Sequence, residues 1–263
     1  MKTRPGSTFQ ATDVVALYRH RPPYAPAALT YVEENAPVCN RLLDLGCGSG
    51  RIACHLAATF DEVTAVDPST AMVAMGRTSS GGDAPNLTWV TSTAEDAPLV
   101  GSYDVVTFAS SIHWMDPTRL FAKLRPHLQP HHMLAMIDGD MPFAPPWQAD
   151  WETFLIKWVP VMSGQPYGSD YWHGLRSRHR PFVDLVDTVE TLSDPISQSV
   201  PDFILSQHAR ETFAPERMGT HREAFDAELA ELLHPHRGSD GLLSYRVKTT
   251  VTHATARKTA LSN

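Results

Sequence analysis

Three glycines and one aspartate form the pattern in this sequence that most clearly indicates chemistry. The glycines occupy alternate positions directly after an apolar run: Gly46, Gly48 and Gly50. A glycine turn between a strand and a helix lets the backbone approach a ligand, and the start of the helix presents free N–H groups. Asp67 ends the next apolar run, about twenty residues on, where α/β nucleotide sites place a carboxylate against a pair of ribose hydroxyls.

The spacing of these glycines separates two kinds of nucleotide site. A dinucleotide fingerprint, G-x-G-x-x-G, requires glycine at position 51, where this chain has Arg51. The pattern here is G-x-G-x-G, and Asp44 precedes it within the apolar run. A nicotinamide oxidoreductase is therefore disfavoured, and the loop is expected to bind a different nucleotide cofactor.

Composition limits the classes of function. The net charge is −7 and the basic residues form no long tract, so nucleic acid is not an expected partner. Cys39, Cys47 and Cys54 are odd in number and are interpreted as reduced thiols of a cytoplasmic protein. We find no apolar signal core at the N-terminus and no apolar run of membrane-spanning length, so no membrane contact is expected.

Short apolar runs alternate with helical patterns over the first half of the chain. Strands enriched in Val, Leu, Ile and Thr are predicted at 41–46, 62–67, 87–93, 103–111 and 132–138. Helices are predicted between them at 50–59, 69–77 and 117–128. This alternation implies right-handed crossovers and an open, doubly wound α/β sheet.

The alternation stops at about residue 140. The segment that follows is rich in Trp, Tyr, His and Arg, fits no simple strand–helix unit, and is predicted to be an inserted helical cap. Strands at 182–191 and 242–255 then complete the sheet, with a helix at 215–233 between them.

Four segments occur in the order and spacing of the motifs of one enzyme family. They are the residues Y-R-H-R-P-P-Y at 18–24, the glycine loop, A-E-D at 94–96 after the third strand, and S-I-H-W-M-D at 111–116 after the fourth. Together they resemble the class I S-adenosylmethionine (SAM) methyltransferases, in particular the type-11 small-molecule group that contains the trans-aconitate methyltransferase relatives. The resemblance implies a Rossmann-like, mostly parallel, seven-stranded sheet, SAM as cofactor with S-adenosyl-L-homocysteine as product, and a small-molecule substrate.

The resemblance also implies a division of the chain. We expect an N-terminal helical lid at 1–40, a SAM-binding core at 41–140, a helical substrate cap at 141–181 and the C-terminal completion of the sheet at 182–263. The protein is expected to be a monomer or a homodimer.

Cofactor contacts follow from the same resemblance. The glycine loop would approach the methionine end of SAM, Asp67 the ribose hydroxyls, and Asp96, favoured over Glu95, the adenine amine. The complete expected set is Tyr18, Asp44, Gly46, Cys47, Gly48, Gly50, Asp67, Pro68, Met72, Glu95, Asp96 and Ser110. The alternative interpretation is an ordinary tight turn for the glycines and a helix N-terminal charge for Asp67.

His113 and Trp114 are placed by topology. If the first and fourth strands flank the point where the winding reverses, these residues face the glycine loop across one crevice. His113 is the candidate catalytic residue, as a base for a hydroxyl, thiol or amine, or as a positioning group that bonds backbone. Trp114 would shape the pocket or lend its π face to the sulfonium.

The substrate site is expected to combine arginine with aromatic walls, which suits a carboxylate. The candidates are Tyr24, His113, Trp114, Trp147, Tyr171, Trp172 and Arg176. The alternative for the arginines at 176–180 is a solvated basic face. No metal site is expected, since the histidine pairs at 131–132 and 234–236 lack partner ligands at suitable spacing.

The predicted function is transfer of the SAM methyl group to a small molecule. O-methylation of a carboxylate is favoured by analogy with the trans-aconitate relatives. Two alternatives remain open: a C-, N- or phenol O-methyltransferase of specialised metabolism, and a protein that binds SAM without catalysis.

Overall fold

The structure is a computed structural model that describes residues 7–258, apart from the side chains of residues 171–173 and 176. The chain divides into two compact units. The sheet unit comprises Pro26–Gly139, Gly174–Thr191 and Thr249–Asn263, and the helical unit comprises Met1–Ala25, Asp140–His173 and Leu192–Lys248. This division cuts across the segments expected from the sequence, because the expected lid at 1–40 contributes to both units.

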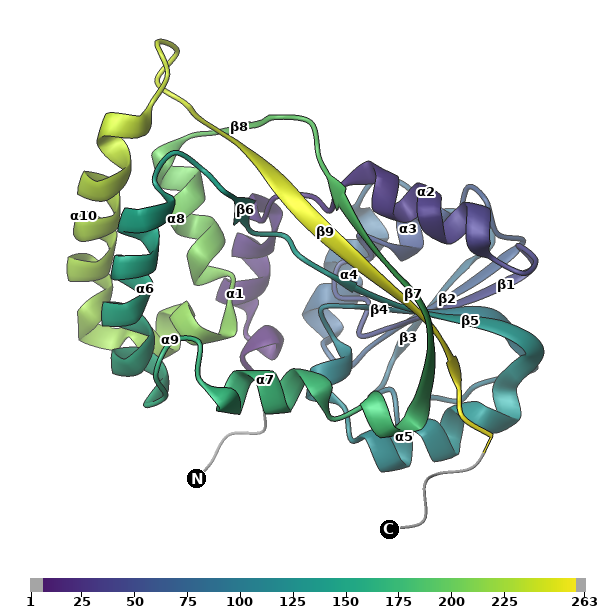
Figure 1. The fold of residues 1–263 in the computed structure, drawn as a ribbon. Helices are drawn as coiled ribbons and strands as arrows, with labels where there is room; N and C mark the ends of the chain where they lie inside the picture. The colour runs from purple at the N-terminus through teal and green to yellow at the C-terminus, as the bar shows by residue number, and fades with distance from the viewer. Residues whose placement is uncertain (1–6, 259–263) are drawn as a thin grey trace. The chain divides into compact units, whose positions relative to one another are not determined.

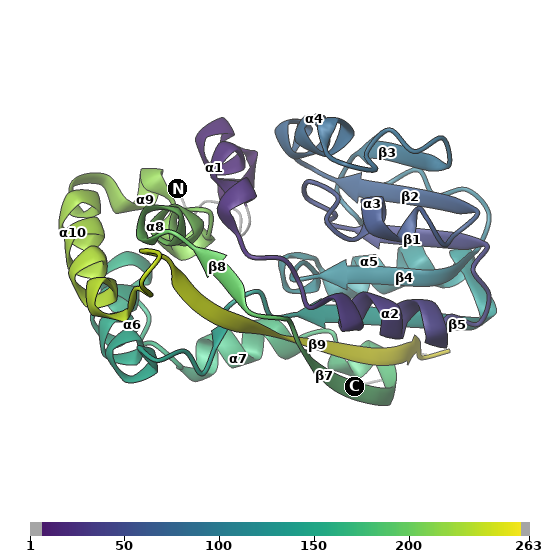
Figure 2. The ribbon, with the colours of Figure 1, turned by 90° about the horizontal axis from the view of Figure 1, so that it is seen from above.

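The sheet unit is built on a mostly parallel sheet in the order β3-β2-β1-β4-β5-β9, with β7 also pairing with β9 (Figure 2). The pairs among β1 to β5 are parallel, and β9 runs antiparallel to β5. The strands are β1 (Arg41–Leu45), β2 (Glu62–Asp67), β3 (Leu87–Thr91), β4 (Tyr103–Ala109), β5 (Leu128–Asp138), β7 (Val183–Leu192) and β9 (Leu243–Ala256). The predicted doubly wound, mostly parallel α/β sheet is confirmed, but two further short strands, described below, also pair with β9 and give the described residues a sheet of nine strands rather than the predicted seven.

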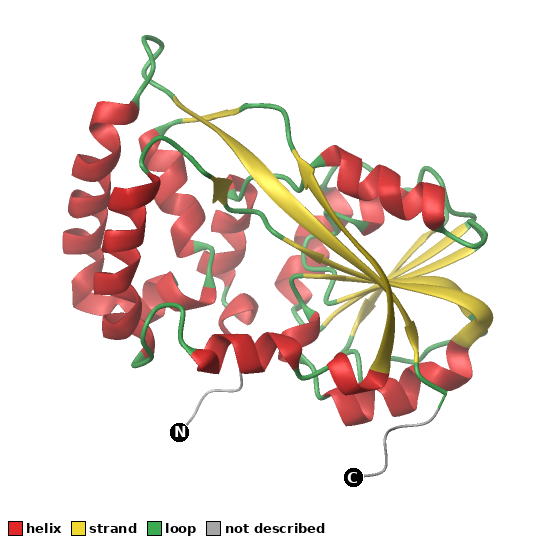
Figure 3. Ribbon diagram, in the orientation of Figure 1, coloured by secondary structure: helices red, strands yellow, loops and turns green. Residues whose placement is uncertain are grey.

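Helices cover both faces of this sheet. Figures 1 and 3 show α2 on one face and α5 on the other. The helices are α2 (Pro26–Asn35), α3 (Ala53–Leu56), α4 (Thr70–Thr78) and α5 (Pro117–Leu124), while α7 (Asp170–Ser177) contains a boundary between the units. Ser69 caps α4 as its sequence predicts, with its Oγ accepting from the N–H of Met72 at 3.2 Å.

Two helices of the sheet unit are shorter in the structure than the sequence predicts. The helix predicted at 50–59 is reduced to α3, because Gly50 has a left-handed φ of +77° and the chain is still turning there. The helix predicted at 117–128 ends at Leu124, and a short 3-10 turn leads into β5, which begins four residues earlier than predicted.

The core of the sheet unit is made by strand residues that are buried on both faces. Leu43 and Leu45 of β1 are fully buried, and Phe121 of α5 packs in the same cluster. Burial of each such side chain is worth about 1.5–3 kcal/mol. The ends of the strands are thereby held rigidly enough to position side chains that follow them.

The helical unit consists of packed helices and short strands. Figure 1 shows α6, α8 and α10 side by side, and their core is aromatic, with the rings of Phe154 and Phe225 4.9 Å apart. Strands β6 and β8 pair antiparallel with residues 243–247 of β9. The elements are α1 (Thr12–Leu17), β6 (Pro142–Phe143), α6 (Gln148–Ser163), β8 (Ile196–Gln198), α8 (Val200–His208), α9 (Pro215–Met218) and α10 (Arg222–Leu233).

Two elements of the helical unit differ from the sequence prediction. The predicted helix at 215–233 is interrupted at Gly219, whose φ of +48° ends α9 before α10 begins. Helix α8 was not predicted, although Ser199 supplies a start signal: its Oγ accepts from the N–H of Asp202 at 3.1 Å.

Candidate active site

The carboxyl ends of β1, β2 and β4 meet where the strand order of the sheet reverses, since β1 pairs with both neighbours in parallel. In open α/β sheets this is the position of the ligand crevice. The loop after β1 is tied to the end of β2, because the N–H groups of Gly46 and Cys47 donate to the carbonyl of Val66 at 2.8 and 3.0 Å. The predicted cofactor loop therefore has a defined conformation.

Asp67 connects the ends of these two strands. Its Oδ2 accepts from the N–H of Gly48 and its Oδ1 from the N–H of Ser69, both at 2.8 Å. Burial raises the pKa of Asp67, while these two backbone hydrogen bonds favour the ionised form. Each oxygen keeps a second lone pair, so the carboxylate can also accept from a pair of hydroxyls. The predicted ribose contact stays a prediction.

Two of the three loop glycines, Gly46 and Gly50, are required by the packing of the protein around them. A Cβ on Gly46 would lie 2.5 Å from the Cβ of Ser111, and one on Gly50 would lie 2.4 Å from the indole of Trp89. The hydroxyl of Ser111 donates to the carbonyl of Leu45 at 2.6 Å. The chain after β4 is therefore packed directly against the loop after β1.

Asp44 is a buried carboxyl group at the base of this loop. Its Oδ1 accepts from the hydroxyl of Thr107 at 2.9 Å, and its Oδ2 has no hydrogen-bond partner among residues 7–258. Burial raises the pKa of Asp44 to about 7, although the hydrogen bonds from Thr107 and the N–H of Ala53 favour ionisation. An unpaired buried carboxylate oxygen is costly, so the site favours a positively charged group nearby.

The raised pKa of Asp44 predicts a pH effect on stability. Between its ordinary pKa of 3.8 and its folded value of about 7, the folded protein holds a proton that the unfolded chain has released. The free energy of unfolding therefore falls as the pH rises through this window, by at most about 4 kcal/mol. The asparagine in Asp44→Asn cannot ionise, so we expect the free energy of unfolding of this variant to change less with pH than that of wild type. The measurement is a series of urea denaturation curves between about pH 4 and pH 8. The exposed Asp61→Asn is the control, and a wild-type slope in Asp44→Asn would contradict the raised pKa.

The two acidic residues after β3, Glu95 and Asp96, lie in different environments. Glu95 is 8% exposed and its Oε1 accepts from the N–H of Asp116, which caps α5, at 2.8 Å. Asp96 is exposed, forms an ion pair with Arg119 at 2.6 Å and accepts from the hydroxyl of Thr93. The favoured adenine ligand Asp96 is thus at the surface, and the adenine contact stays a prediction for both acids.

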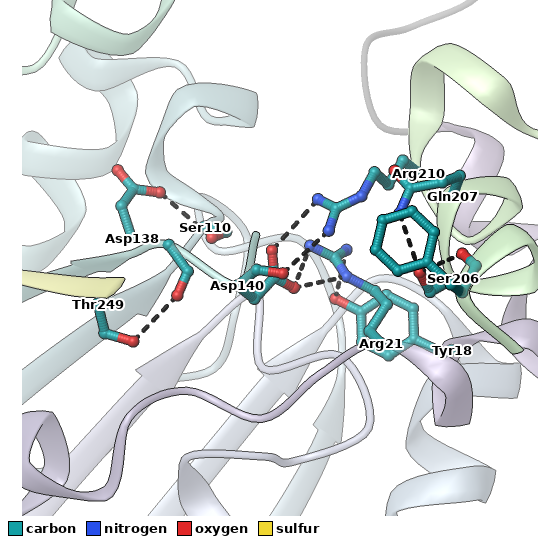
Figure 4. Close-up of polar contacts among 11 residues, drawn as sticks. Tyr18, Arg21, Ser110, Asp138, Asp140, Ser206, Gln207, Arg210 and Thr249 are labelled. Carbon is teal, nitrogen blue, oxygen red and sulfur yellow. Dashed lines mark hydrogen bonds and ion pairs between the residues drawn. The ribbon is translucent and has the colours of Figure 1, made fainter. Parts of the chain in front are cut away.

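Ser110 follows β4 in a strained conformation. Its φ is +50°, which is uncommon for a residue other than glycine and costs about 1–3 kcal/mol. Its hydroxyl donates to Oδ1 of Asp138, at the end of β5, at 3.2 Å (Figure 4). Sequence reasoning missed Asp138, although an acidic residue that ends a predicted parallel strand is a usable signal.

His113 lies in the short turn Ile112–Trp114 after β4 and is half-buried. Its ring is 4.2 Å from the ring of Trp114. The guanidinium of Arg178 donates to the main-chain carbonyls of His113 and Met115 at 2.9 and 3.3 Å. Arg178 therefore fixes the backbone on which the predicted catalytic residue is carried.

The remaining cofactor candidates of the sheet unit flank the loop. Cys47 is buried, and burial raises the pKa of its thiol well above the usual value, so it is neutral. Pro68 is exposed just before α4, and Met72 is buried on that helix. These positions are compatible with packing around a ligand and assign no acid–base chemistry to any of the three.

Other predicted site residues belong to the helical unit. The Tyr18 hydroxyl accepts from Arg21 at 3.3 Å, and Tyr24 is buried. Trp147 is 1% exposed and packs against Tyr245 with ring centroids 6.0 Å apart, which is the environment of a core residue. The side chains of Tyr171, Trp172 and Arg176 lie outside those that the structure describes.

Two absences apply to the described residues. No group of three or more His, Cys, Asp or Glu among them could hold a metal ion. None of the helices in this part of the chain has the length and apolar character needed to cross a membrane.

Part of this chain matches a known protein family. Residues 42–131, which contain the glycine loop, Asp67 and His113, match the sequence model of a family described as a methyltransferase domain. This segment of the chain is therefore similar to a methyltransferase domain. The resemblance to class I methyltransferases, predicted from four motifs, is thereby confirmed.

Curated relatives of this methyltransferase domain match over part of their length. The chain is 34% identical to an uncharacterized methyltransferase of Mycobacterium bovis, over 47% of this chain and 49% of that protein. It is 33% identical to a trans-aconitate 2-methyltransferase of Deinococcus radiodurans, over 36% of each protein. The chain thus spans about half the length, or less, of these curated relatives.

Solved structures support the fold over most of the chain. A protein of Anaeromyxobacter dehalogenans assigned as a type II methyltransferase aligns with a TM-score of 0.70 and 24% identity, covering 90% of this chain and 97% of its own. A methyltransferase of Thiobacillus denitrificans, in complex with S-adenosyl-L-homocysteine, aligns with a TM-score of 0.53 and 16% identity, covering 93% and 97%. The Rossmann-like methyltransferase fold is confirmed.

Proposed function

We propose that this protein is a methyltransferase that transfers the methyl group of SAM to a small molecule. One observation carries the proposal: Asp67, at the end of β2, is hydrogen-bonded to the N–H of Gly48 in the loop after β1. A carboxylate and a glycine turn are thereby joined where two parallel strands end, inside the segment that matches the methyltransferase family. The structural neighbour in complex with S-adenosyl-L-homocysteine supports the choice of cofactor.

The residues of the sheet unit fit this cofactor. Asp67 has lone pairs left for two ribose hydroxyls, and the backbone of the loop at 46–50 would hold the methionine end. Asp44, whose Oδ2 has no partner among the described residues and whose pKa is raised to about 7, would be favoured in its ionised form by a cationic group of SAM bound beside it. SAM supplies an already activated methyl group when bound.

The task of the chain is then mainly alignment. Holding a nucleophile in line with the methyl group supplies much of the rate enhancement by itself. Arg178 fixes the main chain of His113, so His113 can present its ring to the acceptor in one orientation. Whether that ring also takes a proton depends on the acceptor atom, because a carboxylate is ionised at neutral pH and a phenol or amine is protonated in part or in full.

O-methylation of a carboxylate is the reaction that we favour, and the trans-aconitate 2-methyltransferase relative supports it. The test uses methyl-labelled SAM with a panel of small carboxylic acids, phenols and amines, followed by mild alkali on each labelled product. Label released as methanol identifies a methyl ester and is the expected result. Alkali-stable label would assign an ether, amine or carbon acceptor. S-adenosyl-L-homocysteine binding without turnover on any acceptor would favour the non-catalytic alternative.

His113→Gln gives a second test of the same proposal. With a carboxylate acceptor no base is needed, so kcat should fall less than about tenfold and its pH profile should keep its shape. His131→Gln, at an exposed position, is the matched control and should behave as wild type. A loss of about 10²–10⁴-fold with an altered pH profile is the effect of removing a general base, and it would contradict carboxylate methylation.

A further inference from the structure

Three charged side chains meet in the helical unit, and none of the three is among the residues predicted from the sequence to bind substrate. Nε of Arg21 donates to Oδ2 of Asp140 at 2.7 Å, and Nη1 of Arg210 donates to Oδ1 at 3.2 Å (Figure 4). The side chains of Arg21 and Asp140 are 7% and 4% exposed, and that of Arg210 is 18% exposed. We call these residues the Arg21–Asp140–Arg210 cluster.

The cluster carries one positive charge in excess. Two guanidinium groups face one carboxylate, and no second carboxylate among residues 7–258 forms an ion pair with either arginine. Burial and the charge of Arg21 both lower the pKa of Arg210, while Asp140 acts in the opposite direction. An arginine nevertheless stays protonated in proteins, and a buried charge without a counter-charge is costly. The structure therefore provides a place where an anion would be stabilised.

The hydrogen bonds within the cluster identify which arginine has donors left for a bound anion. Arg21 is well supplied, since both its Nε and its Nη2 contact Asp140, and its Nη1 donates to the Tyr18 hydroxyl. Arg210 gives Nη1 to the carboxylate and Nη2 to the main-chain carbonyl of Asp140, at 3.2 and 3.0 Å. Its Nε is buried and has no hydrogen-bond partner in the described part of the chain. Arg210 thus has both spare donors and the uncompensated charge.

We propose that the Arg21–Asp140–Arg210 cluster binds the carboxylate group of a small organic acid, with Arg210 as the direct ligand. A guanidinium holds a carboxylate by two parallel hydrogen bonds, which fixes orientation as well as charge. Arg21 and Asp140 act as positioning residues that hold the guanidinium of Arg210.

The first test needs neither SAM nor turnover. Sodium succinate, inorganic phosphate and sodium chloride are titrated into the full chain at matched ionic strength, with binding measured by calorimetry and thermal unfolding. Succinate should bind and raise the unfolding temperature, as a ligand of the folded state does. Arg210→Gln should weaken succinate binding at least tenfold. The control Arg217→Gln also removes an arginine paired with one carboxylate, Glu211 at 2.7 Å, and should bind succinate as wild type. Phosphate binding tenfold tighter than succinate would overturn the carboxylate assignment.

A second variant separates an anion site from a purely structural ion pair. Asp140→Asn leaves two guanidinium groups without a carboxylate, so it should bind succinate more tightly than wild type and regain thermal stability when succinate is added. Arg210→Gln and Asp140→Asn are therefore expected to shift succinate affinity in opposite directions. Unchanged succinate affinity in both variants would overturn the proposal, because a structural ion pair predicts that result.

Titration with S-adenosyl-L-homocysteine distinguishes failure of this inference from failure of the proposed function. Wild type and Arg210→Gln should bind it equally. A tenfold loss of S-adenosyl-L-homocysteine affinity in Arg210→Gln would assign the cluster to the cofactor and overturn the inference, while the proposed function would stand. If wild type did not bind S-adenosyl-L-homocysteine, the proposed function would be contradicted. The succinate titrations would still test whether the cluster binds an anion.

Discussion

Replacing Gly46 with alanine should abolish measurable cofactor binding while both units stay folded. The added Cβ would lie 2.5 Å from the Cβ of Ser111, a separation that real side chains do not tolerate. Ser111 cannot withdraw easily, since its hydroxyl is bonded to the carbonyl of Leu45 at 2.6 Å. The clash must move either the loop after β1 or the chain after β4, which leads to His113. We expect S-adenosyl-L-homocysteine affinity to fall at least ~100-fold, about 2.7 kcal/mol, by calorimetry.

The matched control for this substitution is Gly241→Ala. Gly241 has a φ of +79°, close to the +68° of Gly46, but no atom lies within 4 Å of the position of its Cβ. The control therefore carries the backbone strain of a left-handed alanine, about 1–2 kcal/mol, without the clash. Gly241→Ala should lower the unfolding temperature and leave cofactor affinity intact. Wild-type affinity in Gly46→Ala would show that the cofactor does not use this loop.

The sheet could be predicted because its determinants are local. Parallel strands buried on both faces appear in the sequence as continuous apolar runs, and the start of α4 is marked by Ser69, which caps it in the structure. The sequences of strands β6 and β8 contain no such continuous apolar run. These strands are two and three residues long and exist by pairing with β9, so their formation depends on contacts far away in the sequence.

The candidate active site shows the same limit of sequence-based prediction, because some of its contacts join residues that are far apart in the sequence. That Asp67 lies beside the glycine loop follows from topology, because neighbouring parallel strands end at one edge of the sheet. The contact of Arg178 with the carbonyl of His113 joins residues 65 positions apart, and no spacing rule indicates it. Asp140 brings together Arg21 and Arg210 across separations of 119 and 70 residues. A sequence shows which residues are able to bind an anion, whereas the fold decides which of them retain an unpaired donor.

Asp67→Ala is expected to weaken S-adenosyl-L-homocysteine binding by roughly 100- to 1,000-fold. Hydrogen bonds to a charged group are worth about 1.5–3 kcal/mol each, and the proposal assigns two ribose hydroxyls to this carboxylate. The substitution also frees the N–H groups of Gly48 and Ser69, so part of the loss would come from a loosened loop. The exposed Asp61→Ala is the control for removal of an acidic charge and should bind as wild type.

The two contributions of Asp67 can be separated with the ligand rather than the protein. Adenosine and 2′,3′-dideoxyadenosine differ in the two hydroxyl groups, so the ratio of their affinities reports on the ribose contact alone. Wild type should prefer adenosine, and in Asp67→Ala the preference should disappear because both nucleosides then lack the same partner. A loosened loop would weaken both nucleosides equally and leave the ratio unchanged. If the preference survives in Asp67→Ala, the ribose is held elsewhere, and Asp67 serves to fix the conformation of the glycine loop through Gly48.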